Sequence, residues 1–225
     1  MSQTATHPHM SLRPVRVLVT LGTTLALLLS AGCSDDSPSS APDRNSSSGN
    51  PSSESPEPPA PEPWVEISDK DTGVKFMFPE KVKPARKPKT MPDGSKAVAK
   101  GYAASADGVS MSVSIITSDG DLSALDGQTV LNAMVNGLNR AGSKDTTLSK
   151  VHAAGVRGDG SATDGTITFV SKQDQPAYWR LRIVGSDDGH MLVYIQALTN
   201  AGPEQKQARK LVDGAFDRLV DSFSL

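Results

Sequence analysis

Hydrophobic and polar residues alternate in several segments after residue 64. The clearest is 109–117, "VSMSVSIIT", in which Val109, Met111, Val113 and Ile115 alternate with serines. Because successive side chains of a strand point to opposite faces of a sheet, this segment is predicted to be a strand with one buried face. Further strands are predicted at 74–79, 96–104, 146–154, 165–172, 177–185 and 190–198.

Short turn sequences connect these strands. An Asp-Gly pair at 107–108 and an Asp-Asp-Gly sequence at 187–189 each separate two alternating segments. Such turns between alternating runs predict β-hairpins. The glycine-rich segment 155–165 is predicted to be a plain connection between strands.

Two other segments repeat at helical spacing. In 127–141 apolar residues recur three or four positions apart, and Gly142 can end the helix. In 203–222 Pro203 suits the first turn, and the predicted apolar stripe comprises Ala208, Leu211, Val212, Ala215, Phe216, Leu219 and Val220. Each helix is polar on its other side and is expected to pack on the sheet. The prediction is an α+β domain with an antiparallel sheet of about six to seven strands and two packed helices.

The first 63 residues contain no aromatic side chain. Residues 1–32 carry Arg13, Arg16 and an uncharged apolar run at 17–29, which predicts a secretory signal peptide. The following "LSAGC" resembles the lipobox of bacterial lipoproteins, which implies that Cys33 is lipidated and becomes the first residue of the mature protein. The expected location is therefore the outer, extracytoplasmic face of the cytoplasmic membrane.

Two other interpretations of Cys33 are less well supported. A buried core cysteine would not precede thirty residues of polar sequence, in which ten are serine and eight are proline. A transmembrane anchor needs roughly 20 apolar residues, more than the run at 17–29 contains. Residues 33–63 are predicted to be a disordered tether. The proline-rich part at 56–63, "PEPPAPEP", could instead be a docking motif, although it lacks a P-x-x-P sequence with a flanking basic residue.

Residues 64–225 are predicted to form one folded domain. Three stretches of it resemble the PsbP-like fold and, more narrowly, the LpqN-type lipoproteins of high-GC bacteria. They are "TGVKFMFPEKV" at 72–82, "AAGVRG" at 153–158 and "FDRLVDSFSL" at 216–225. Proteins that these stretches resemble include interaction proteins, photosystem accessory subunits and uncharacterised lipoproteins. The resemblance brings no shared catalytic residues, so none are assigned from it.

No motif for catalysis or metal binding emerges from the sequence. His152 and His190 have no partner at ligand spacing, and a single cysteine excludes a cysteine-based zinc site. In 118–130, Asp119 and Asp121 fit a calcium-loop pattern, but the required glycine and glutamate are missing. We therefore expect no enzyme activity, no cofactor and no metal. The formal net charge of −2 gives no reason to expect a nucleic-acid partner.

A basic run lies just after the first predicted strand. "KVKPARKPK" at 81–89 contains Lys81, Lys83, Arg86, Lys87 and Lys89 and no acid. Lysine and proline protect an exposed sheet edge from pairing with another chain. The same residues could contact anionic lipid headgroups or envelope polymers. Both interpretations stay open.

These observations predict a non-catalytic lipoprotein of the cell envelope whose domain binds another protein. Its partners would be the membrane, through the lipid anchor, and an envelope protein of unknown identity. The alternative is a carrier or binder of lipid or another amphiphile, which would need a large apolar cavity. An enzyme with a dispersed site has no sequence signature in its support.

Overall fold

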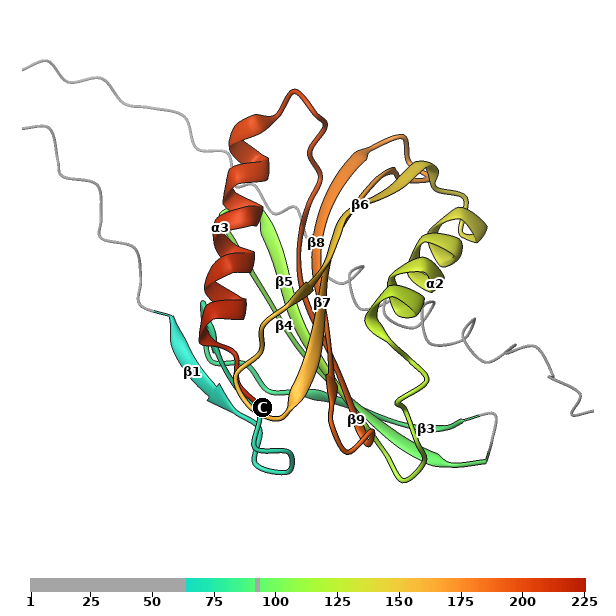
Figure 1. Ribbon diagram of the computed structural model, residues 1–225. Helices are drawn as coiled ribbons and strands as arrows, with labels where there is room; N and C mark the ends of the chain where they lie inside the picture. The colour runs from blue at the N-terminus through green and yellow to red at the C-terminus, as the bar shows by residue number, and fades with distance from the viewer. Residues whose placement is uncertain (1–63, 92–93) are drawn as a thin grey trace, which may run out of the picture.

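A computed structural model describes residues 64–91 and 94–225; the predicted signal peptide, Cys33 and the predicted tether lie outside these ranges. The described chain forms a seven-stranded antiparallel sheet in the order β3-β4-β5-β9-β8-β7-β6, a two-stranded sheet β1-β2 and two helices (Figure 1). This confirms the predicted α+β architecture. The strands are β1 Val65–Ser68, β2 Lys75–Phe78, β3 Ala85–Thr90, β4 Lys96–Ala106, β5 Val109–Ser118, β6 Lys144–Ala154, β7 Gly160–Val170, β8 Pro176–Ser186 and β9 Met191–Thr199; the helices are α2 Gly127–Arg140 and α3 Lys206–Ser222.

The two predicted hairpins are confirmed. Strands β4 and β5 pair up to Ala106 and Val109, and both turn residues, Asp107 and Gly108, have positive φ angles of 52° and 73°. Strands β8 and β9 pair as antiparallel neighbours across the second turn. The two halves of the sheet meet at its centre, where β5 pairs with β9.

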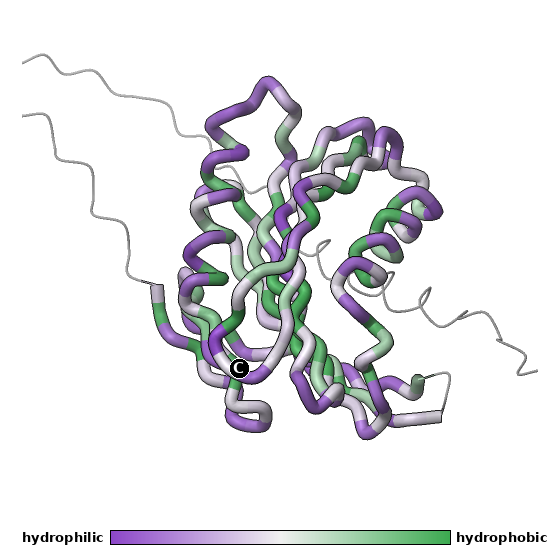
Figure 2. The backbone as a smooth tube through the Cα atoms, in the orientation of Figure 1, coloured by the Kyte–Doolittle hydropathy of each residue, from purple (hydrophilic) through white to green (hydrophobic). Residues whose placement is uncertain are grey.

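The sheet separates two hydrophobic clusters. Alternate residues of β8 belong to different clusters: Trp179 and Leu181 pack on the side of α2, whereas Tyr178 and Val184 pack on the side of α3. Helix α3 and the β1-β2 hairpin cover one face, and α2 covers part of the other (Figure 1). Figure 2 shows hydrophobic residues recurring along the strands and on the helices where they approach the sheet.

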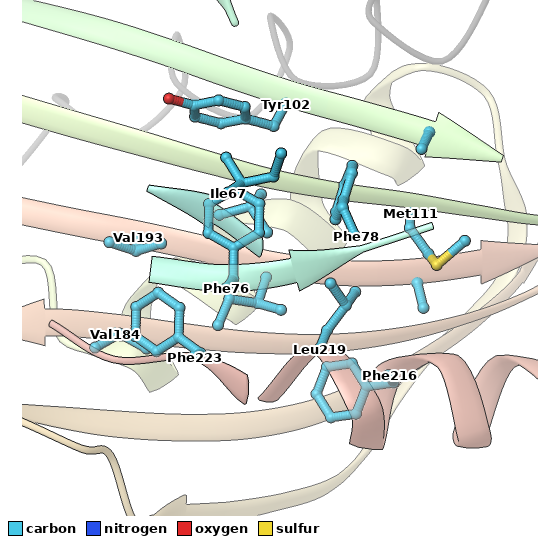
Figure 3. Packing of buried hydrophobic residues seen from close by; sticks show 14 of the residues in the cluster. Ile67, Phe76, Phe78, Tyr102, Met111, Val184, Val193, Phe216, Leu219 and Phe223 are labelled. Carbon is cyan, nitrogen blue, oxygen red and sulfur yellow. The ribbon is translucent and has the colours of Figure 1, made fainter. Parts of the chain in front are cut away.

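Aromatic residues fill the cluster beneath α3 and the small hairpin (Figure 3). Phe76 packs edge-on against Phe78 and Tyr102, with ring centroids 5.4 and 5.2 Å apart. Phe216 from α3 and Phe223 from the C-terminal segment are almost completely buried in the same cluster. These contacts fix α3 and the β1-β2 hairpin on one face of the sheet.

Strand β5 differs from its prediction, because both of its faces are buried. Ser112 and Ser114 are only 9% and 4% exposed. The alternation of serine with apolar residues indicated a solvent-facing side. However, β5 lies in the middle of the sheet, where neighbouring strands and side chains on both sides limit access of water. The small serine side chains are compatible with this position.

Two predicted boundaries are wrong. Helix α3 begins at Lys206, so Pro203 lies before the helix; the backbone N–H of Gly202 donates to Gln205 Oε1, at 2.7 Å, within a turn that precedes it. Strand β7 begins at Gly160, so the second half of the predicted connection 155–165 belongs to a strand. A Cβ at Gly165 would lie 2.8 Å from Leu131 Cδ1 of α2, so a larger residue here would require the buried Leu131 side chain to shift.

Strands β1 and β3 were not expected from alternation. β1 has four residues, and β3 is almost entirely exposed and contains Pro88. β3 is nevertheless the edge strand of the large sheet, which confirms the expected edge position of most of the basic run. The end of α2 is as predicted, since Gly142 follows it with a φ of 91°.

Candidate functional site

An open groove lies between α3 and the turn that joins β4 to β5. We name it the α3 groove; it has a volume of about 610 Å³. Val109 and Met111 of β5, each 2% exposed, form its apolar floor. Trp64 and Pro79 line it beside the start of the described chain. The groove therefore combines residues from both ends of the folded domain.

The sequence of α3 leaves this groove open. Leu211, Gly214 and Arg218 recur at helical spacing and line the same side of the helix. Apart from the neighbouring residues and the adjacent backbone of α3, no heavy atom of the described chain lies within 4 Å of the place where a Cβ of Gly214 would sit. Leu211 is 40% exposed, although it was predicted to belong to the buried stripe. Its position at the edge of the stripe places it in the groove wall instead.

The rim of the groove carries more positive than negative charge. Lys210 and Arg218 come from α3, and Asp107 comes from the opposite turn. The guanidinium of Arg218 lies over the ring of Trp64, 4.4 Å from its centroid. This cation–π contact holds Trp64 against the helix while leaving Arg218 largely exposed.

A second set of polar contacts seats α3 on the sheet. Arg180 Nη1 of β8 lies 2.6 Å from Asp213 Oδ1, and the Tyr178 hydroxyl donates to the same oxygen at 2.9 Å. Arg180 also lies over the Phe216 ring, 4.5 Å from its centroid. Burial by itself would lower the pKa of Arg180, but its contacts with Asp213 raise it. The helix that forms the groove wall is thus fixed by charge as well as by packing.

An ionic cluster around the buried pair of Lys100 and Asp69 holds the β1-β2 hairpin in place. Lys100 Nζ of β4 lies 2.8 Å from Asp69 Oδ1 and 2.6 Å from Asp71 Oδ2, and the Tyr102 hydroxyl donates to Asp69 Oδ2 at 2.6 Å. Burial would raise the pKa of Asp69, but hydrogen bonds, the one from Lys100 first, lower it to about 2. Because β1 begins next to Trp64, this cluster also positions one wall of the groove.

The basic run does not form one continuous patch. Lys81 and Lys83 precede β3, where Arg86 lies opposite Lys100 and approaches Asp71 to 3.9 Å. Lys87 and Lys89 lie opposite Ala99 and Ala97. Residues directly opposite each other on paired strands lie on the same face of the sheet. Lys87 and Lys89 therefore lie on the face that carries α2, and Arg86 lies on the opposite face. Contact of the basic run with an anionic surface stays a prediction. Lys87 and Lys89 would make this contact from the same face of β3.

The remaining predicted positions do not assemble a site. His152 Nε2 lies 3.9 Å from Asp164 Oδ2, and His190 Nδ1 lies 3.2 Å from the carbonyl oxygen of Gly120. Among the described residues, no three histidine, cysteine, aspartate or glutamate side chains gather closely enough to hold a metal ion.

Asp126 caps α2 by accepting from the Thr129 backbone N–H at 2.9 Å. Asp119 instead accepts from the Lys96 backbone N–H, and Asp121 from that of Ser123. Each of these acids therefore accepts a backbone hydrogen bond that supports the fold of this loop and its neighbours.

The described residues thus define a small α+β domain with an antiparallel sheet, two packed helices and an open surface groove. Neither helix, α2 or α3, is long and apolar enough to span a membrane. No family model and no curated protein matches the sequence. Among solved structures, the chain is similar to LpqN of Mycobacterium tuberculosis, which is involved in cell envelope biogenesis. The TM-score is 0.37 at 13% identity, over 74% of this chain and 80% of that one.

Proposed function

We propose that the protein is a cell-envelope lipoprotein, anchored through Cys33, whose domain binds another envelope protein in the α3 groove. The observation that carries this proposal is the groove itself. The groove exposes apolar surface in its wall, where Leu211 is 40% exposed, and its walls belong to elements that are fixed by the Arg180–Asp213 and Lys100–Asp69 contacts. A preformed groove on rigid elements binds with little loss of conformational entropy.

The lining specifies the chemistry of the partner segment. Leu211 and the partly exposed Trp64 offer apolar contact area, whereas Lys210 and Arg218 offer positive charge at the rim. The matching segment is extended, carries apolar side chains that contact Leu211 and Trp64, and carries carboxylates that reach the two cations. Complementary charge of this kind favours specificity and fast association.

Photo-crosslinking in intact cells tests this proposal. A photoreactive benzoylphenylalanine at Leu211 should give an adduct with one envelope protein, because this side chain is exposed in the groove wall. The control is the same group at Asn132, an exposed position of α2. Gly214→Leu should fill the groove and remove the adduct, whereas Gly137→Leu in α2 should leave it. Equal adducts at both crosslinker positions would contradict the proposal.

The anchor has a separate test. Cys33→Ala removes the sulfur that would carry the acyl chains, so the protein should move from the membrane fraction to the soluble fraction. A variant that stays in the membrane fraction to the same extent would contradict lipidation at this residue.

The exposed apolar wall at Leu211 also leaves amphiphile binding as an alternative function. Native mass spectrometry of the purified full chain separates the two functions. A lipid that co-purifies at one-to-one stoichiometry, and that Gly214→Leu removes, would favour the carrier. Its absence, together with a protein adduct at Leu211, would favour the protein-binding function.

A further inference from the structure

We propose that residues 56–63 of the protein's own tether occupy the α3 groove when no partner is bound. This inference rests on the proposed function of the groove and adds a mode of regulation to it. A partner would bind by displacing the tether segment. The apparent affinity of the partner for the groove would therefore fall with the fraction of time for which the tether occupies it.

The path of the chain brings this segment to the groove. The described chain starts at Trp64, which itself lines the groove and stacks under Arg218. Residue 63 is therefore covalently held at the groove. Lys210 lies eight residues before Arg218 on α3, which corresponds to about 12 Å along the helix axis. An extended proline-rich chain rises about 3.1 Å per residue, so four residues of the tether cover that distance.

The composition of the segment matches the lining. "PEPPAPEP" has five prolines and one alanine, which can contact the apolar wall formed by Leu211 and Trp64, and two carboxylates at Glu57 and Glu62. The rim offers Lys210 and Arg218 as counter-charges. Among the tether residues, this stretch alone combines closely spaced prolines with acids and no base, since the part before it is rich in serine and includes Arg44.

Two physical effects favour this occupant over an unlinked one. A proline-rich segment is already extended, so it loses little conformational entropy when it docks in a groove. Its covalent link to Trp64 also makes binding intramolecular, with an effective concentration in the millimolar range for a short connection. A contact that is weak between separate molecules is therefore well populated within one chain.

Intramolecular crosslinking of the purified full-length lipoprotein in detergent tests this inference in the absence of a partner. Benzoylphenylalanine at Leu211 should crosslink to residues 56–63, as identified by mass spectrometry of the digested protein. Glu57→Gln together with Glu62→Gln should lower the yield about two- to tenfold, because exposed ion pairs contribute modestly. The matched control, Asp35→Asn with Asp36→Asn, removes two charges elsewhere in the tether and should leave the yield unchanged.

The outcomes for the tether and for the partner can be told apart. Equal crosslinking of the tether from Leu211 and from Asn132, or a yield that the two glutamate substitutions do not change, would overturn tether docking. A partner adduct in cells would then still support the groove as a binding site. Conversely, tether crosslinks with no partner adduct in cells, even in the Glu57→Gln, Glu62→Gln variant, would leave tether docking supported and overturn the proposed function.

Discussion

Lys100 and Asp69 form an ion pair in which both side chains are nearly inaccessible to water. Lys100 is 8% exposed and Asp69 is 3% exposed, and the pair connects β4 of the large sheet to the turn of the β1-β2 hairpin. Burial would lower the pKa of Lys100, but its bonds to Asp69 and Asp71 raise it. The pair therefore stays charged in the folded protein and ties the small hairpin to the sheet.

Removing only the lysine should destabilise the domain strongly. Lys100→Met leaves the Asp69 carboxylate buried without its counter-charge, which costs about 3–5 kcal/mol in the free energy of unfolding. Urea unfolding, followed by tryptophan fluorescence, measures this loss. The double variant Asp69→Asn, Lys100→Met should recover a large part of it, because neither partner is then left as an isolated charge.

The exposed pair nearby serves as the control for that experiment. Arg86 approaches Asp71 only to 3.9 Å, and both side chains are more than half exposed. Arg86→Gln should therefore change the free energy of unfolding by less than about 1 kcal/mol. A loss in Lys100→Met as small as that in Arg86→Gln would contradict a stabilising buried pair.

Acid should weaken the folded domain between about pH 4 and pH 2. The pKa of Asp69 falls from 3.8 to about 2 on folding, since its hydrogen bonds outweigh the effect of burial. A pKa that is lower in the folded state stabilises the protein at pH values above the unfolded-state pKa. This stability is lost as the pH falls towards 2. The difference corresponds to about 2 kcal/mol. Unfolding in urea at a series of pH values should show the loss, and Asp69→Asn should reduce it.

A side chain at Gly214 should fit without strain. Alanine is more favourable than glycine in a helix by about 0.5–1 kcal/mol, and a Cβ at position 214 meets open space in the described structure. Gly214→Ala should therefore raise the midpoint of thermal unfolding. Gly137→Ala in α2, where the space is equally open, should do the same. A drop in stability for Gly214→Ala alone would mean that the helix packs differently at the groove.

Binding to an anionic surface should depend mainly on Lys87 and Lys89, because these two lysines share a face of β3. Their replacement by glutamine should weaken binding to phosphatidylglycerol vesicles at low salt about 30-fold, at about 1 kcal/mol per cation. Arg86→Gln should have less effect, since Arg86 lies on the other face near Asp71. Unchanged binding combined with new self-association would favour the edge-protection interpretation.

Alternation and turn chemistry were sufficient to predict the four strands of the two hairpins, β4, β5, β8 and β9. The two faces of these strands pack against different layers, which gives them their alternating pattern. Turns with positive φ join the strands into hairpins, and their sequences show this as well. β1 was missed because four residues are too few for a period to emerge. β3 was missed because its lysines and Pro88 reflect an exposed edge rather than a half-buried face.

The candidate site could not be predicted in the same way. The α3 groove depends on where α3 lies relative to a turn about 100 residues earlier in the chain, and no periodic pattern encodes that relationship. One signal was present: Gly214 interrupts a helix whose apolar stripe includes Leu211 at its edge. A glycine beside a marginal apolar position is consistent with a gap in the packing, but the sequence does not indicate which element faces it.

The placement of β1 also determines how the domain would respond to mechanical load on its N-terminal segment. Val65 pairs with Phe78 at the end nearest that segment, and Ser68 pairs with Lys75 next to the turn. Tension applied at residue 64 would therefore load the hydrogen bonds of this short ladder one after another. A ladder that is loaded in this way resists force poorly. Peeling would then reach the turn, where Asp69 is held by Lys100. The hairpin would thus extend under low force while the ion pair protects the seven-stranded sheet behind it.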